Sequence, residues 1–128
     1  MIKIIDSHCH LYYELYISNL NKVIQDCRER DVFLMLTIGV DYETSLKNIE
    51  ISKNHDEIYC TVGLHPNNVL NKKNDIKKIL SLTSNHNKII GIGECGIDLF
   101  RSKDNLYDQI NIFEQQIEKS IEKEIPFI

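Results

Sequence analysis

Apolar residues along the chain alternate between short continuous runs and helical spacings of three and four. The runs at 2–5, 33–40, 58–64 and 89–93 are typical of strands, and 125–128 begins a fifth run. The helical spacing lies between the runs, at Leu20, Val23, Ile24, Cys27, Leu46, Ile49, Ile76, Ile79, Leu80, Leu106, Ile110, Phe113, Ile117 and Ile121. The pattern therefore predicts strands and helices in strict alternation.

Polar residues stand where the predicted helices begin. Ser18 is the expected N-cap of the first helix, Asp41 opens the second, and Asn74 or Asp75 starts the third. The middle strands are apolar on both faces, which is typical of a parallel sheet covered by helices. We therefore predict the α/β class with right-handed crossovers.

Length leaves two architectures of this class open. A TIM-type β/α barrel needs about 250 residues, and this chain has 128. The pattern then corresponds to the N-terminal half of such a barrel, about four and a half βα units. An open doubly wound sheet also fits the length, and periodicity does not separate the two. The chemistry below favours one incomplete barrel domain over residues 1–128, truncated at the fifth strand.

Composition and charge narrow the classes of function. A net charge of −4 argues against a protein that coats nucleic acid by bulk electrostatics. No apolar run approaches a membrane span, and the N-terminus has no signal-peptide pattern, so we expect a cytoplasmic protein without a membrane partner. The 4 cysteines form no CxxC pair. We expect them to be reduced, with Cys60 as a small core residue.

His8 and His10 lie two residues apart at the end of the first predicted strand. Side chains at this spacing point to one side of a strand, with Cα atoms roughly 6.5 Å apart. Two such imidazoles can close on one cation at about 2.0–2.1 Å. A chelating pair is one interpretation, and two polar histidines in a strand-to-loop turn is the other.

Two further candidates follow the third and fourth strands. Glu94 shares strand parity with Ile90 and Ile92, so its carboxylate would end an otherwise apolar strand face. A carboxylate buried there needs a cation, a proton or a hydrogen-bond partner. The alternative is a solvated Glu94 in a turn. His65 is held extended by Pro66, either as a ligand or as a hydrogen-bonded turn residue. All these positions end strands, on the rim where β/α barrels place active sites. Two histidines and a carboxylate suit a divalent cation of borderline hardness.

Motifs at these positions resemble one family along nearly the whole chain. The segments DSHCH at 6–10, VGLHP at 62–66 and IGECGID at 92–98 resemble the TatD-type metal-dependent deoxyribonucleases, a branch of the amidohydrolase-like barrels. A helix pattern leading to 125–128 adds to the likeness, at Gln109, Phe113, Gln116 and Ile117. The resemblance implies hydrolysis of DNA phosphodiester bonds by metal-activated water, with two divalent cations such as Mg²⁺, Mn²⁺ or Zn²⁺.

The resemblance also implies roles for single residues. His8 and His10 would bind one metal, and Glu94 would bridge both and serve catalysis. His65 is assigned a substrate contact, and Asp98 either orients a ligand or water or caps a turn. A His after the fifth strand begins, a His on the sixth and an Asp ending the eighth would complete the site, and all three fall beyond the printed sequence.

The chain departs from the family pattern in the residues that would meet substrate. Asn67 replaces a histidine, and Leu99 and Phe100 replace tyrosines.

The basic loop residues could meet substrate phosphates or be solvated surface, and they are Lys72, Lys73, Arg101 and Lys103. Activity should fall as the ligand imidazoles protonate.

Two alternatives to a DNA hydrolase stay open. The same barrel could act on a small amide, ester or lactone. The chain could also be an inactive truncated fragment. Its unpaired strand edges and bare apolar faces would then predict self-association or pairing with a missing C-terminal half.

Overall fold

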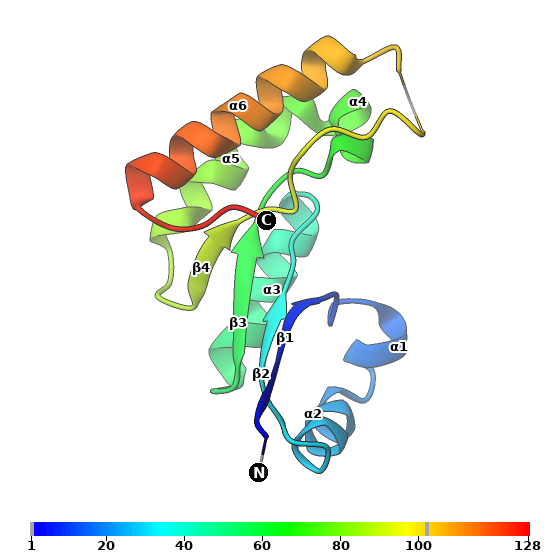
Figure 1. The fold of residues 1–128 in the computed structure, drawn as a ribbon, viewed down its shortest axis with the longest axis vertical. Coiled ribbons are helices and arrows are strands. Elements are labelled where there is room, and N and C mark those ends of the chain that lie inside the picture. The colour runs from blue at the N-terminus through cyan, green and yellow to red at the C-terminus, as the bar shows by residue number, and fades with distance from the viewer. Residues whose placement is uncertain (1, 102) are drawn as a thin grey trace.

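A computed structural model describes residues 2–101 and 103–128, whose strands form one parallel sheet (Figure 1). The strands are β1 (Ile4–Cys9), β2 (Val32–Thr37), β3 (Ile58–Val62) and β4 (Ile89–Ile92). Their spatial order is β1-β2-β3-β4 and every pair is parallel. The predicted α/β class with a parallel sheet is confirmed.

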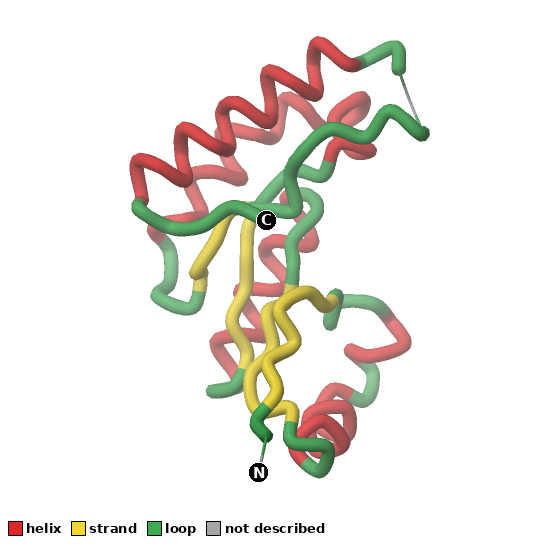
Figure 2. Tube along the Cα trace, in the orientation of Figure 1, coloured by secondary structure: helices red, strands yellow, loops and turns green. Residues whose placement is uncertain are grey.

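Helices connect successive strands (Figure 2). The α-helices are α1 (Glu14–Ile17), α2 (Leu20–Arg28), α3 (Tyr42–Asn54), α4 (Val69–Lys72), α5 (Ile76–Ser81) and α6 (Leu106–Lys123). Short 3₁₀ turns are η1 (Pro66–Asn68), η2 (Lys73–Asp75) and η3 (Leu82–Ser84). Within the described residues, no helix is both long and apolar enough to cross a bilayer.

Two apolar clusters lie between the helices and the sheet. One joins β3 and β4 to α3, α5 and α6, through Ile49, Cys60, Val62, Leu64, Val69, Ile76, Ile79, Leu82, Ile89 and Ile112. The other lies under α2, and its members are Leu11, Tyr12, Leu20, Ile24, Met35, Ile51 and Ile58. Cys60 is fully buried, as predicted.

The first segment differs from the prediction at Ser18. β1 extends to Cys9, so His8 and His10 lie at its carboxyl end, as predicted. Ser18 does not cap α2, because its hydroxyl donates to the Glu14 carbonyl at 2.8 Å and ends the unpredicted α1. Asn19 is the residue before α2.

The second helix begins as predicted. The Asp41 side chain accepts from the Thr44 N–H at 2.8 Å, and the Thr44 hydroxyl accepts from the Asp41 N–H at 3.0 Å. This reciprocal capping box satisfies two free donors at the start of α3. Asp75 precedes α5, also as predicted.

The predicted apolar stripe of α6 is not its buried face. Gln109, Ile112, Gln116 and Ser120 are buried, whereas Ile121 is 71% exposed. The reason is a specific bond: the Gln116 amide accepts from Leu64 N–H at 2.9 Å and donates to Leu64 C=O at 3.2 Å. After α6, Phe127 forms a parallel bridge with Ile92, as expected where a fifth strand begins.

Candidate metal centre

Three of the predicted ligands meet at the carboxyl ends of the strands. Nε2 of His8 lies 3.4 Å from Oε2 of Glu94, and Nε2 of His10 lies 3.7 Å from the same oxygen. One ligand atom from each residue lies within 4.8 Å of the others. The structure therefore places these side chains where one cation could touch all three.

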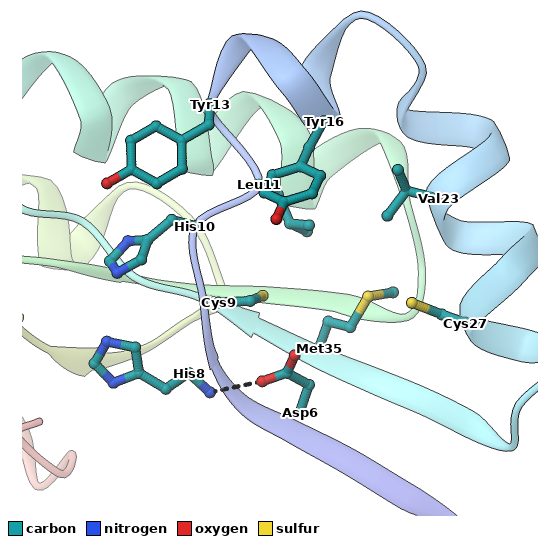
Figure 3. A pocket seen from close by; sticks show the side chains of 10 residues that line it. All are labelled: Asp6, His8, Cys9, His10, Leu11, Tyr13, Tyr16, Val23, Cys27 and Met35. Carbon is teal, nitrogen blue, oxygen red and sulfur yellow. Dashed lines mark hydrogen bonds between the residues drawn. The ribbon is translucent and has the colours of Figure 1, made fainter.

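The end of β1 directs the two histidines to one side (Figure 3). The Asp6 carboxylate accepts from the His8 N–H at 3.1 Å, and the pairing with β2 shifts register between Asp6 and Cys9. The thiol of Cys9 points to the other side and donates to the Leu36 carbonyl at 3.3 Å. Burial, followed by the nearby Asp6 charge, raises the pKa of the Cys9 thiol to about 12. Because this thiol lies on the other side of β1 and is bonded to a carbonyl, it does not face the cation position between His8 and His10.

Three consecutive backbone carbonyls, at 38–40 just after β2, fix the candidate residues. The oxygen of Ile38 lies 3.2 Å from Nδ1 of His10. The second carbonyl accepts from the backbone N–H of Glu94 at 2.5 Å, and the third accepts from that of His65 at 2.9 Å. Segments from three different strands are thus tied to one short stretch of backbone. The sequence contained no signal for it, since backbone carbonyls are present at every position.

Glycine allows the ends of β3 and β4 to touch. A Cβ at Gly63 would collide with the backbone of Gly93, which has φ of 148°. The Thr61 hydroxyl donates to the Gly93 carbonyl at 2.7 Å, and this hydrogen bond joins the two strand ends. The predicted strand parity of Glu94 is wrong, because β4 ends at Ile92 and the chain turns at Gly93. After this turn the backbone N–H of Glu94 donates to the Gly39 carbonyl, and the carboxylate lies beside His8 and His10.

His65 also reaches Glu94, from the opposite side. Its Nε2 lies 3.4 Å from Oε1, the oxygen that does not face His8 and His10. The residue is extended before Pro66, with φ of −64° and ψ of 141°, as predicted. Its Nδ1 accepts from the backbone N–H of Asn67 at 3.1 Å.

Asp98 acts as a turn cap. Its Oδ1 accepts from the backbone N–H of Phe100 at 2.8 Å and of Arg101 at 3.4 Å. The Phe100 hydrogen bond is the main cause that lowers the pKa of Asp98, and a side-chain bond from Asn67 and the nearby His65 add to it against partial burial. An orienting role towards a ligand stays a prediction.

Two of the predicted basic loop residues are engaged by carboxylates. Lys72 Nζ lies 2.7 Å from Asp41 Oδ2 and 3.1 Å from Glu43 Oε2. Lys73 Nζ lies 2.7 Å from Asp108 Oδ2. Both ammonium groups are paired with carboxylates of this chain, which favours the solvated-surface interpretation over contact with phosphates.

Cavities open on both sides of His10. One of about 310 Å³ lies beside two of the candidate ligands and is lined by His10, Tyr12, Tyr13, Val40, His65, Asn68 and Glu94. The other, of about 380 Å³, lies between β1 and α2 and includes the apolar side chains of Leu11, Val23 and Met35 (Figure 3). Because Glu94 and His65 line the first together with His10, whereas His8 and His10 line the second without Glu94, we take the first as the candidate substrate cleft. The tyrosines that line it were missed, since aromatic residues after a strand read equally well as core.

Comparisons with known proteins agree with the motifs. A family model described as TatD related DNase matches residues 5–128. An uncharacterized metal-dependent hydrolase of Buchnera aphidicola subsp. Baizongia pistaciae is 30% identical over 128 residues, covering 98% of this chain and 48% of that protein. The uncharacterized metal-dependent hydrolase YabD of Bacillus subtilis is 29% identical, covering 96% and 48%. The chain spans about half the length of the relatives it matches.

Solved structures show the same fold. YJJV, a TatD homolog from Escherichia coli K12, matches with a TM-score of 0.88 at 20% identity, over 97% of this chain and 49% of that one. A TatD family hydrolase of Entamoeba histolytica matches with a TM-score of 0.80 at 21% identity, over 98% and 48%. The sequential strand order also lacks the switch point of a doubly wound sheet. The predicted partial β/α barrel is confirmed.

Proposed function

Because the chain belongs to the TatD-related DNase family, we propose that its rim site serves metal-dependent hydrolysis of phosphodiester bonds in DNA. The observation that carries this proposal is the convergence of His8, His10 and Glu94 within 4.8 Å. Convergence at the carboxyl ends of parallel strands matches the place where β/α barrels carry out chemistry.

The protonation of His10 fits a cation ligand. A carbonyl oxygen only accepts hydrogen bonds, so the contact between Nδ1 and the Ile38 oxygen at 3.2 Å requires the proton on Nδ1. The neutral ring then has its lone pair on Nε2, which faces Glu94. A backbone partner of this kind is usual for metal-binding histidines. Two imidazoles and one carboxylate suit Mn²⁺ or Zn²⁺.

The side chains divide the work at this rim. A bound divalent cation would supply the Lewis acidity that activates water and stabilises charge on a phosphoryl group. His8, His10 and Glu94 would hold this cation, the two histidines through the lone pairs of neutral rings. Four lone pairs on the carboxylate allow Glu94 to serve a second cation as well. The cleft of about 310 Å³ that His10 and Glu94 line would receive the scissile group.

Hydrolysis assays with a matched variant test this function. Mn²⁺-loaded protein is incubated with DNA oligonucleotides, with bis-p-nitrophenyl phosphate and with p-nitrophenyl acetate. We expect cleavage of both phosphodiesters and a loss of about 100-fold or more in Glu94→Gln, which keeps the shape but removes the charge. His55→Asn, at the end of α3, is the control and should cleave like the parent.

Two results would contradict the proposal. One is cleavage of the acetate ester without cleavage of either phosphodiester, which would favour a small-molecule hydrolase. The other is phosphodiester cleavage that survives in Glu94→Gln, which would place the reaction elsewhere on the protein.

A further inference from the structure

We propose that His65 does not bind the cation but positions Glu94 by donating a hydrogen bond from Nε2. The inference rests on the proposed function in one respect, namely that Glu94 is a cation ligand. It replaces the substrate contact assigned to His65 from the sequence.

The backbone selects one tautomer of His65. The N–H of Asn67 points at Nδ1 of His65 over 3.1 Å. A backbone N–H only donates, so Nδ1 must offer its lone pair, and the neutral ring carries its proton on Nε2. That Nε2 lies 3.4 Å from Oε1 of Glu94. The group facing the carboxylate is therefore a donor and lacks the lone pair that a cation needs.

His10 shows the opposite arrangement on the other side of the same carboxylate. Its Nδ1 faces the Ile38 carbonyl, an acceptor, so the lone pair is on Nε2. Glu94 thus has a ring with a free lone pair near Oε2 and a ring with an N–H near Oε1. Two histidines of similar appearance in the sequence acquire different roles from the backbone group behind each ring.

The orientation of His65 is fixed by its surroundings. The backbone N–H of His65 donates to the Val40 carbonyl at 2.9 Å, and Pro66 begins η1 directly after it. The side chain is only 23% exposed. Turning the ring over would move Nδ1 away from the Asn67 N–H, so this one bond fixes the ring face as well as the proton.

Donation from His65 should restrict the Glu94 carboxylate. A carboxylate ligand keeps its orientation when its other oxygen accepts a hydrogen bond from the protein. Loss of such a partner typically weakens metal affinity by about 10–100-fold. His65→Gln and His65→Asn form a matched pair for this role. The Gln amide reaches about as far as Nε2 and can donate to Glu94, whereas the shorter Asn amide ends near Nδ1 and cannot.

The first test reads the tautomers directly in metal-free protein. Long-range ¹H–¹⁵N spectra are recorded where the rings are neutral. We expect the proton on Nε2 of His65 and on Nδ1 of His10. Glu94→Gln should shift the Nε2–H signal of His65 and leave that of His86 unchanged. A proton on Nδ1 of His65, or no response to Glu94→Gln, overturns the proposal.

The second test is titration of Mn²⁺ into both variants. His65→Gln should keep the parent affinity within about threefold, and His65→Asn should lose about 10–100-fold. Equal large losses would identify His65 as a ligand, and no loss in either would remove its positioning role. If the parent itself fails to bind Mn²⁺, the proposed function falls, while the spectra still decide the direction of the His65 hydrogen bond.

Discussion

Strands β1 and β3 lie in the same sheet but differ in almost every physical respect. β1 is exposed at every position up to Cys9, whereas β3 is buried except at Tyr59. β1 carries His8 and leads to His10, and β3 contributes no candidate ligand. The strand that carries the chemistry is therefore a different strand from the one that stabilises the fold.

Their neighbours explain the difference. β3 pairs with both β2 and β4 and packs against α3, whereas β1 pairs with β2 alone. Ile4 is 47% exposed and Ile5 is 55% exposed. The histidines keep their places mainly through contacts of the chain end of β1 with Thr37 and Ile38. A site can be well ordered at the tip of a strand that is itself weakly buried, because stability varies along a structure.

The largest effect is expected in β3. Ile58 is fully buried, so Ile58→Ala should lower the free energy of unfolding by about 3 kcal/mol through lost burial and a new cavity. Urea denaturation followed by circular dichroism measures this loss. A loss in the free energy of unfolding below about 1 kcal/mol would contradict the contrast between β3 and β1. β3 would then contribute no more to stability than an exposed strand.

The bond that ties the end of β3 to α6 comes next. Gln116→Leu leaves the N–H and C=O of Leu64 buried without their side-chain partner, which should cost about 2 kcal/mol. Gln115→Leu, one residue earlier and bonded only to Asn111 on its own helix, is the matched control. Equal melting temperatures for the two variants would show that the buried amide does not stabilise the rim.

A smaller, pH-dependent effect is expected at the start of α3. Burial alone would raise the pKa of Asp41, but hydrogen bonds from Lys72 and Thr44 outweigh it and lower that pKa. A lowered carboxyl pKa stabilises the fold above the unfolded value and ceases to do so as pH falls through the folded value.

Asp41→Asn separates this charge from the helix cap. Asn is also a good N-cap, so the variant should lose only about 1 kcal/mol at neutral pH. The difference should begin to shrink below about pH 4, where the carboxyl of the unfolded chain takes up a proton, and should vanish once the pH falls through the lower pKa of the folded state. Unfolding curves across this range measure it, and a difference that is constant or grows in acid would contradict the assigned shift.

The smallest effect is expected on β1. Ile5→Ala removes a side chain that is already half exposed, and should cost about 0.5 kcal/mol. The same urea series as for Ile58→Ala gives the value. A loss near 2 kcal/mol would mean that another part of the protein or a second copy covers this face in solution, and light scattering on the parent would distinguish the second case.

Periodicity predicted the main elements because burial governs them. The alternation of apolar runs and helical spacing located all four strands and the longer helices, and Asp41 was identified by its capping chemistry. Periodicity gave the wrong buried face for α6. Gln109 and Gln116 occupy that face because their amides bond to the backbone of Asp98 and Leu64. A pattern of hydrophobicity does not include such bonds.

The candidate ligands were also visible in the sequence, but their arrangement was not. His8, His10 and Glu94 stood out by residue type and by their places after strands. The carbonyls at 38–40 that fix them, and the turn at Gly93 that redirects Glu94, depend on backbone geometry. The different proton positions of His10 and His65 follow from those same backbone partners.

Calorimetric titration of Mn²⁺ into the parent and into His10→Ala, Glu94→Gln and His55→Asn tests the central claim most directly. We predict one saturable binding event that weakens by about 100-fold or more in the first two variants, each of which removes a ligand. His55→Asn, far from the rim, should match the parent. Equal affinity in all four proteins, or no binding to the parent, would contradict a metal centre formed by His8, His10 and Glu94.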